Sequence, residues 1–372
     1  MKEQIHPYSC RNDNTVESNP ACNTMPIKNL ALTPMILLLA FLAGSLLLLA
    51  GACSDQSSLS IDDPDELEVT YDTFIFRHGN GMAINNSNIM VGSQTVPQNS
   101  ANVNRAIRWS VQNGRSFLNG LEEHTRAFGI NDRGEIVGEM ETNFISKGFL
   151  HVEGTLTELK KINNDDRTFA HSINNRGTIV GVTIKDRDSY MVVWHRKDND
   201  SYGIPEVLGR TSYSHVSTPY INNKGEIAAV LFDSATMDFR AAIVQPDENG
   251  RYGAPFWLGA VEGNINIGGI NDSGVVVGSQ WIWLPENYDE PISIHFGRAK
   301  AINNHNQIVG HQGFKPTLWT IESDGQIKTQ SLEIQNKISG TAHSINDNGW
   351  ITGHVWEPPL GARYAAIWRP VD

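Results

Sequence analysis

Cysteine and positive charge are both scarce in this sequence. Its 372 residues include only three cysteines, Cys10, Cys22 and Cys53, and 29 basic residues against 41 acidic ones, a formal net charge of −12. So few cysteines exclude a disulfide-stapled fold, and the protein must therefore rely on a hydrophobic core. The negative balance argues against a nucleic-acid partner, because phosphate binding needs clustered basic residues. It also argues against electrostatic docking on anionic lipid.

The sequence also lacks the short motifs of common enzymes and metal sites. It has no Gly-x-Ser-x-Gly turn, no Walker or dinucleotide-binding loop, no Asp-x-Gly-x-Thr-Trp box and no Cys–His cluster with zinc-ligand spacing. The acidic pairs Glu122/Glu123 and Asp165/Asp166 fall in predicted loops, where adjacent carboxylates are usually solvated. We therefore predict no catalytic residue, no cofactor and no metal ligand.

Long hydrophobic runs are absent except at residues 35–52, MILLLAFLAGSLLLLAGA. Lys28 precedes this run and small residues end it, which is the pattern of a secretory signal. A plain transmembrane anchor is the alternative, although the run is barely long enough to span a bilayer. We interpret residues 1–52 as a cleaved signal region. We expect the true start at Met25, because MPIKNLALTPMILLL makes a more typical signal.

The end of this run resembles the lipobox of bacterial lipoproteins, with Ala50 where that family more often has Leu. The resemblance implies that Cys53 is acylated and becomes the mature N-terminus. Residues 53–67 would then be the attachment cysteine and a flexible polar tether, and only the acyl chains would hold the protein at a membrane. Ser54 resembles the residue of lipoproteins sorted to the outer membrane. The expected location is therefore the bacterial cell envelope, at the outer membrane.

The rest of the chain is built from a repeated motif. Few segments have a helical period, and 33 Gly and 16 Pro favour a turn-rich β protein. A nine-residue motif that begins with Ile-Asn occurs seven times, at spacings of 32 to 49 residues, which indicates a repeat architecture. The copies are INNSNIMVG (84–92), INDRGEIVG (130–138), INNRGTIVG (173–181), INNKGEIAA (221–229), INDSGVVVG (270–278), INNHNQIVG (302–310) and INDNGWITG (345–353).

A second element alternates with the first. It is a short apolar run that ends in Trp in five of its seven copies, and a weaker apolar patch follows it, as in SFLNGL (116–121). The seven runs are AIRW (106–109), GFLH (148–151), MVVW (191–194), AAIV (241–244), QWIW (280–283), PTLW (316–319) and AAIW (365–368).

These elements leave room for four short strands in each unit. Repeated four-stranded units of 40–50 residues are typical of β-propellers. We therefore predict that residues 68–372 form one all-β domain, a seven-bladed β-propeller with four-stranded blades. The C-terminal Trp strand would join the N-terminal blade, so that the two ends of the chain share a blade and the ring closes without open sheet edges.

The Ile-Asn motif is predicted to be a strand, a tight turn and a strand. Asn131 suits the first position of a type I turn, where its side chain accepts a hydrogen bond from the backbone two residues on. Gly134 then takes a left-handed conformation and returns the chain, as in a three-residue hairpin loop. The predicted turn residues are Asn131, Gly134, Asn174, Gly177, Asn222, Gly225, Asn271, Gly274, Asn346 and Gly349.

The exceptions support a turn rather than a calcium loop. Asn88 and Asn306 replace the glycine in two copies, and Asn is the residue that best tolerates positive φ after Gly. Calcium sites need several oxygen ligands, usually with carboxylates. Here the second motif position holds Asp in only three copies, Asp132, Asp272 and Asp347, and Asn in the other four. Asp at this position is therefore interpreted as optional.

The entry strand and turn resemble the HAF-type repeat of probable extracellular bacterial proteins. The forms that carry the resemblance are RAFGINDRGEIVG, AHSINNRGTIVG and TAHSINDNGWITG, within about residues 70–370. The His-Ala-Phe triplet of the family's name is not intact in any copy. The resemblance implies an exported, repeat-built β protein and no defined activity, so no catalytic residue follows from it.

Function is expected where the copies differ. His171 and His343 lie two residues before their Ile, where other copies have Met82, Phe128, Pro219, Gly268 and Lys300; we interpret this as a half-exposed strand position. His151, in place of a Trp, is interpreted as a packing variant. The main hypothesis is a lipid-anchored binding or scaffold module for a protein or glycan. The alternative is a hydrolase or lyase that acts on a carbohydrate or lactone in the central funnel. A funnel lined by Gly, Ala and Ser alone would exclude this alternative.

Overall fold

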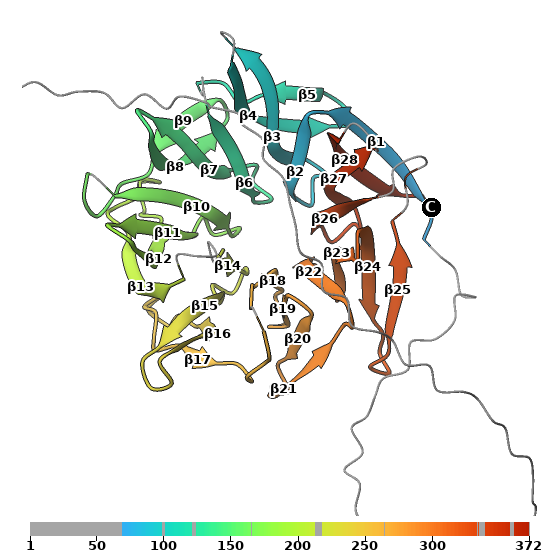
Figure 1. Ribbon diagram of the computed structural model, residues 1–372. Helices are drawn as coiled ribbons and strands as arrows, with labels where there is room; N and C mark the ends of the chain where they lie inside the picture. Colours follow the sequence, from blue (N-terminus) through green and yellow to red (C-terminus); the bar gives the residue numbers. More distant parts are fainter. Residues whose placement is uncertain are drawn as a thin grey trace, which may run out of the picture. The chain divides into compact units, whose positions relative to one another are not determined.

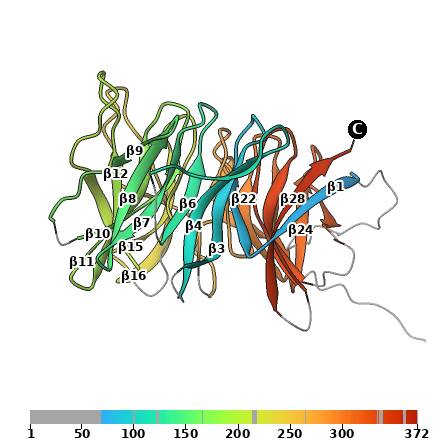
Figure 2. The same ribbon diagram turned by 90° about the horizontal axis from the view of Figure 1, so that it is seen from above.

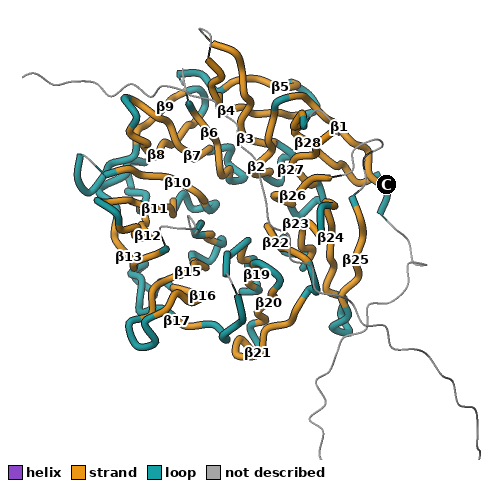
Figure 3. Tube along the Cα trace, viewed as in Figure 1, coloured by secondary structure: helices purple, strands orange, loops and turns teal. Residues whose placement is uncertain are grey.

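The computed structural model describes residues 69–371 except 99–100, 121–123, 165, 213–217, 264, 333, 335–338 and 358–360. In these residues 28 strands form seven four-stranded antiparallel sheets arranged in a ring (Figures 1 and 3). The predicted seven-bladed β-propeller is thus confirmed. The described residues contain no helix that is long and apolar enough to cross a membrane. The predictions for residues 1–67, including the acylation of Cys53, lie outside the described residues.

Six blades follow the chain in order from the ring axis outward, and in each the strand that enters the Ile-Asn turn is innermost (Figure 1). Blade 1 consists of β2 (Gly79–Ile84), β3 (Met90–Gln98), β4 (Ala101–Ser110) and β5 (Gly114–Phe117). Blade 2 consists of β6 (Thr125–Ile130), β7 (Ile136–Thr142), β8 (Ile145–Val152) and β9 (Thr155–Glu158). Blade 3 consists of β10 (Arg167–Ile173), β11 (Ile179–Lys185), β12 (Asp188–Trp194) and β13 (Glu206–Thr211). Blade 4 consists of β14 (Tyr220–Ile221), β15 (Ile227–Asp233), β16 (Asp238–Val244) and β17 (Phe256–Trp257). Blade 5 consists of β18 (Gly269–Ile270), β19 (Val276–Gly278), β20 (Trp281–Leu284) and β21 (Asn287–Ser293). Blade 6 consists of β22 (Gly297–Ile302), β23 (Gln307–Gln312), β24 (Lys315–Ile321) and β25 (Ile327–Ser331). Seen from its edge, the ring has strands that run between its two faces (Figure 2).

The seventh blade joins the two ends of the propeller, as predicted. It consists of β26 (Ser339–Ile345), β27 (Ile351–Glu357), β28 (Ala362–Pro370) and β1 (Tyr71–Arg77). β1 pairs antiparallel with β28 from Tyr71↔Pro370 to Arg77↔Tyr364 and is the outermost strand. The shared blade is therefore the last one, while the first Ile-Asn hairpin belongs to a blade that is complete without the C-terminal strand.

The hydrophobic core lies between neighbouring blades. Successive residues of a strand face opposite sides of a sheet, so an apolar run such as Ile136–Val137 serves two interfaces. Val137 of blade 2 packs with Ala170, Ile179 and Trp194 of blade 3, and all four are at most 1% exposed. The Trp of the third strand fills the space between blades. His151 takes the same place in blade 2 and is also buried.

The Ile-Asn turns have a common hydrogen-bond pattern. In the turn after β6, Gly134 N donates to Asn131 O, and Asn131 Oδ1 accepts from Arg133 N and Glu135 N. Gly134 has φ of +78°, and Asn88 and Asn306 have φ of +58° at the equivalent position. The side chain of the first Asn therefore holds its own turn closed, and the fourth residue returns the chain in the left-handed region.

The turns also join the blades through two closed rings of hydrogen bonds. In the first ring each buried first Asn donates from Nδ2 to the backbone carbonyl of the next blade's first Asn, at 2.7–3.1 Å. In the second ring each backbone N–H of the second residue donates to Oδ1 of the next blade's second residue, at 2.7–2.9 Å. Asp and Asn both supply this Oδ1, which explains why no other residue type occurs there.

Candidate functional site: the central channel

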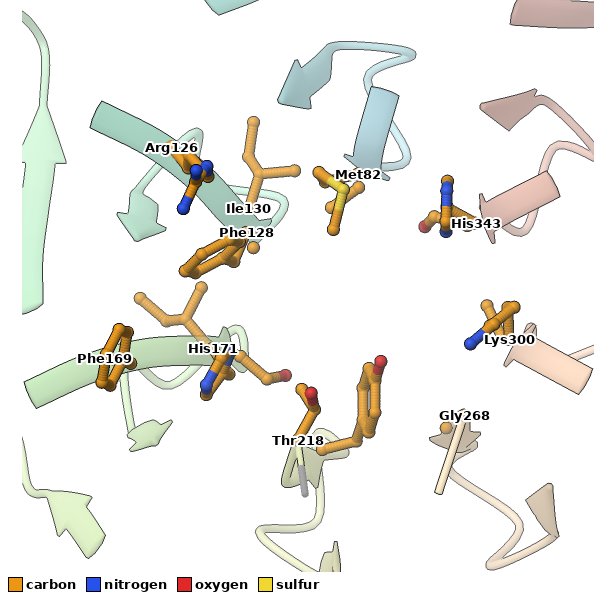
Figure 4. A pocket seen from close by; sticks show the side chains of 18 of the residues that line it. Met82, Arg126, Phe128, Ile130, Phe169, His171, Thr218, Gly268, Lys300 and His343 are labelled. Carbon is orange, nitrogen blue, oxygen red and sulfur yellow. The ribbon is translucent and has the colours of Figure 1, made fainter. Parts of the chain in front are cut away.

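A β-bulge on the innermost strands directs variable side chains to the ring axis. In five blades the pairing register with the second strand shifts by one residue, for example between Ala127 and Gly129. A bulge leaves one residue outside the ladder and turns its side chain. The bulged residues are Met82, Phe128, His171, Lys300 and His343, and they face the central space together with residues from the other two blades (Figure 4).

A close approach of the innermost strand explains the glycine that ends the repeated motif. A Cβ on Gly138 would lie 2.0 Å from the Arg126 carbonyl oxygen, so only Gly fits beneath the bulged strand. Five other blades have the same close approach, 1.9–2.1 Å, at their corresponding glycine. Ala229 replaces Gly in blade 4, where the innermost strand pairs only Tyr220 and Ile221 with its neighbour.

The innermost strands enclose a cavity of about 780 Å³. This volume lies in the range of small-molecule sites. The Ile of each motif borders this cavity and also a smaller one of about 160 Å³ among the Ile-Asn turns. An apolar layer of seven Ile therefore separates the main cavity from the ring of amides and carboxylates at one mouth. Away from this layer the lining extends to His124 and Arg167, where the innermost strands β6 and β10 begin.

Aromatic side chains form one side of the cavity. The ring of His171 stacks with Phe128, at 5.1 Å between ring centroids and 28° between planes, and with Phe169, at 6.2 Å and 13°. Burial lowers the pKa of His171 to about 4, so its ring is neutral at pH 7, and its Nε2 has no hydrogen-bond partner in the described residues. Tyr220 borders the same side, and burial raises its pKa to about 12. The result is an uncharged, largely flat surface.

An ion pair lies beside this aromatic side. Arg126 Nη1 is 2.5 Å from Glu139 Oε1, and both side chains line the cavity. The Glu139 side chain is only 8% exposed, whereas that of Arg126 is 49% exposed. The guanidinium can therefore hydrogen-bond a ligand without leaving its carboxylate.

The opposite side of the cavity is basic. Lys300 projects from the bulge of β22, and His343 from the bulge of the neighbouring β26 (Figure 4). His343 Nε2 is 2.8 Å from His354 Nδ1, which is 3.2 Å from Asn80 Oδ1. Burial, with smaller contributions from the neighbouring basic groups, holds the pKa of His343 well below its usual value and lowers that of His354 to about 3. Both rings are therefore neutral at pH 7.

The structure revises the roles expected from the sequence. The Asn and Gly turn residues lie at one mouth, where the Asn side chains connect neighbouring blades. Asp132 was interpreted as optional; its Oδ1 accepts a hydrogen bond from Asn86 N of the adjacent blade, and Asn175 accepts the same bond in the next blade. His171 and His343 line the cavity rather than an ordinary strand face; the variety of residue types at a fixed repeat position was the signal. Arg126 and Glu139 carried no sequence signal, because they meet only across two paired strands.

The acidic pairs noted in the sequence do not contribute to the cavity lining as far as the structure describes them. Glu122, Glu123 and Asp165 lie outside the described residues. Asp166 is buried and accepts hydrogen bonds from Asn163, away from the cavity lining. Across the described blades, no group of three or more His, Cys, Asp or Glu side chains is placed to hold a metal ion.

Comparisons with known proteins identify the fold alone. Neither a protein-family profile nor a curated protein sequence matches this chain. Among solved structures, the β-propeller domain of the Trilobed protease from Pyrococcus furiosus is similar with a TM-score of 0.55 and 10% identity, covering 79% of this chain and 95% of that one. Pyrococcus horikoshii acylaminoacyl peptidase gives 0.51 and 10%, covering 80% of this chain and 53% of that one. A gluconolactonase from Xanthomonas campestris gives 0.45 and 10%, covering 81% and 91%.

Proposed function

We propose that this protein is an exported binding module that holds a glycan in its central channel. The observation that carries the proposal is the stack of Phe128, His171 and Phe169 beside the Arg126–Glu139 pair. A sugar presents C–H bonds on the faces of its ring and hydroxyl groups around its edge. The C–H bonds suit the electron-rich faces of aromatic rings, and the hydroxyl groups suit a guanidinium and a carboxylate at the rim of the stack.

Calorimetry or a glycan array with the full-length chain tests this proposal. A Phe128→Ala variant removes one of the two partly exposed phenyl rings that line the cavity, and we expect it to weaken glycan binding about ten-fold or more, about 1.4 kcal/mol. The matched control is Phe256→Ala, because Phe256 is 53% exposed on the outermost strand of blade 4. Absence of binding to any glycan, or an equal loss in both variants, would contradict a glycan site in the channel.

The attachment to the envelope forms a separate part of the proposal. We infer that Cys53 is acylated and that the acyl chains tether the propeller to a membrane, on the basis of the signal-like run that precedes Cys53. Cys53→Ser should abolish lipid labelling and release the protein into the soluble fraction. Unchanged fractionation would refute the lipoprotein interpretation without bearing on the channel.

An enzyme that acts on a carbohydrate or lactone is the second candidate. The observation that favours it is the pair of neutral, hydrogen-bonded rings of His343 and His354 at the channel wall. A neutral His is the form that accepts a proton in general base catalysis. Release of a product from a bound glycan, lost in His343→Gln but retained in His195→Gln on the outer surface, would replace the binding proposal by this one.

A further inference from the structure

Lys300 gives the channel wall a positive charge that the protein does not neutralise. The residue is half-buried in the cavity lining, and it forms no hydrogen bond or ion pair with the described part of the chain. Burial lowers the pKa of its ammonium group, and the neighbouring Arg298 lowers it further. No carboxylate of the described residues contributes to the pKa shift of the Lys300 ammonium group.

The titratable groups around Lys300 on its own blade and on the following blade are all basic, while the preceding blade presents Gly268. Arg298 precedes it on β22, His311 lies across the sheet on β23, and His343 and His354 belong to the next blade. His354 is acted on by Arg363, His311 and Lys300, again with no carboxylate among the described groups. A partly buried positive charge without a counter-ion costs free energy. An anion that enters the channel offsets that cost, since an opposite charge favours the charged form.

His343 adds a hydrogen-bond donor to this corner. Asn80 Oδ1 can only accept, so the proton of neutral His354 is placed on Nδ1, where it reaches both Asn80 Oδ1 and His343 Nε2. His343 then carries its own proton on Nδ1, and that nitrogen forms no hydrogen bond with the described residues. An N–H group near an ammonium suits an anionic oxygen.

The position of this corner relative to the aromatic stack defines a ligand with two different ends. Lys300 and His343 come from blades 6 and 7, and Phe128 and His171 from blades 2 and 3, across the ring axis (Figure 4). Gly268 lies between Thr218 and Lys300 around the axis and contributes no side chain to the lining there (Figure 4). A molecule that fills the cavity therefore touches the aromatic surface, with the Arg126–Glu139 pair beside it, on one side and the corner of Lys300 and His343 on the other.

We propose that the bound glycan is anionic, with a carboxylate or phosphate at Lys300 and His343 while a neighbouring sugar ring lies on the Phe128–His171–Phe169 stack. The inference rests on the proposed glycan-binding function and narrows it to one chemical class. The protein as a whole carries a net charge of −12, so long-range attraction of anions does not explain such a preference. The selectivity belongs to this corner of the channel.

Binding of matched oligosaccharides to the full-length chain tests the inference. The probes are a uronic-acid trisaccharide, the neutral trisaccharide of the same linkage and a phosphorylated sugar, measured by calorimetry at low salt. We expect at least one anionic probe to bind about ten-fold tighter than the neutral one, and the tighter of the two identifies the anionic group. Lys300→Met should reduce that ratio to about one and leave the affinity for the neutral sugar nearly unchanged.

The matched control is Lys224→Met, because Lys224 is exposed in an Ile-Asn turn at the opposite mouth. This variant should keep the full preference. Equal affinity for neutral and anionic probes, or a preference that survives in Lys300→Met, would overturn the inference while the glycan-binding proposal stands. If none of the probes nor any other glycan binds, the proposed function itself fails.

Discussion

The arrangement of Asp and Asn around the second hydrogen-bonded ring makes a graded prediction about stability. The order is Asn86, Asp132, Asn175, Asn223, Asp272, Asn304 and Asp347, so no two carboxylates are neighbours. Each carboxylate Oδ2 instead accepts from the side-chain amides on both sides, for example from Asn86 and Asn175 at Asp132. Three is the largest number of carboxylates that seven positions can hold without a pair. Every Asn→Asp change therefore creates at least one like-charged contact.

The magnitude follows from the local geometry. Asn175 Nδ2 is 2.7 Å from Asp132 Oδ2, and Asn175→Asp replaces this donor by a second carboxylate oxygen while Oδ1 still accepts from Asp132 N. Two unit charges about 4 Å apart repel by about 1 kcal/mol in water and about 4 kcal/mol near a protein surface. With solvent screening and one lost hydrogen bond, we expect a loss of about 1–3 kcal/mol in the free energy of unfolding. Asn86→Asp should cost about twice as much, because both of its neighbours, Asp132 and Asp347, are charged.

Thermal and denaturant unfolding of the purified variants provide the assay. The loss should be smallest for the exposed control Asn113→Asp, intermediate for Asn175→Asp and largest for Asn86→Asp. Added salt should reduce the difference between the last two, since repulsion between exposed charges is screened. Equal stability of Asn175→Asp and Asn86→Asp, or a loss that salt does not change, would refute the charge-separation argument.

Three further substitutions test the turns and the bulge. Gly134→Val should destabilise the protein by about 1–3 kcal/mol, because Gly134 has φ of +78° and a β-branched residue is strained there. No atom lies within 4 Å of an added Cβ, so a steric clash does not contribute, and Gly134→Asn should be nearly neutral. Equal effects of the two substitutions would contradict backbone strain as the cause. Gly138→Ala should lower the free energy of unfolding by about 1–3 kcal/mol by overpacking, whereas Gly148→Ala on the next strand, where the nearest atom lies 3.4 Å from the added Cβ, should change it little. The denaturant midpoints of the two variants compare these effects. An unchanged midpoint in Gly138→Ala would mean that the two strands separate easily. Burial raises the pKa of Glu135, but hydrogen bonds from Asn131, Arg196 and Arg133 lower it, so that it lies below the ordinary 4.5 overall. Glu135→Gln should therefore lower the free energy of unfolding fully above about pH 4.5, and the difference should disappear as the pH falls below that value. A difference that does not change with pH would show that the Glu135 carboxylate is not its source.

Much of the architecture could be predicted from the sequence, because seven copies of the repeat can be compared at each position. Gly134 and its Asn replacements identified the left-handed turn, and the alternation with Trp runs indicated four strands per blade. The apolar Ile136–Val137 pair faces both neighbouring blades, and for that reason it gave no sign of which strand lies at the axis. The resemblance to the HAF-type repeat and the acylation of Cys53 stay predictions.

The candidate site was much less accessible to sequence reasoning. A bulge shifts the register by one residue without requiring a special residue type, so the direction of Phe128 could not be read from its position. Arg126 and Glu139 meet across two strands, and the His343–His354 contact likewise depends on the pairing of β26 with β27. Asp132 accepts its hydrogen bond from a residue of another repeat, and the local sequence pattern does not identify that partner.

Histidine NMR tests the central claim, that the ring axis is the ligand site, most directly. The imidazole signals of His171 and His343 would be followed during titration with a glycan that calorimetry shows to bind, with His195 on the outer surface as the internal reference. The account predicts saturable shifts of both channel histidines at the calorimetric affinity and no change at His195. Saturable binding that leaves His171 and His343 unshifted would contradict it.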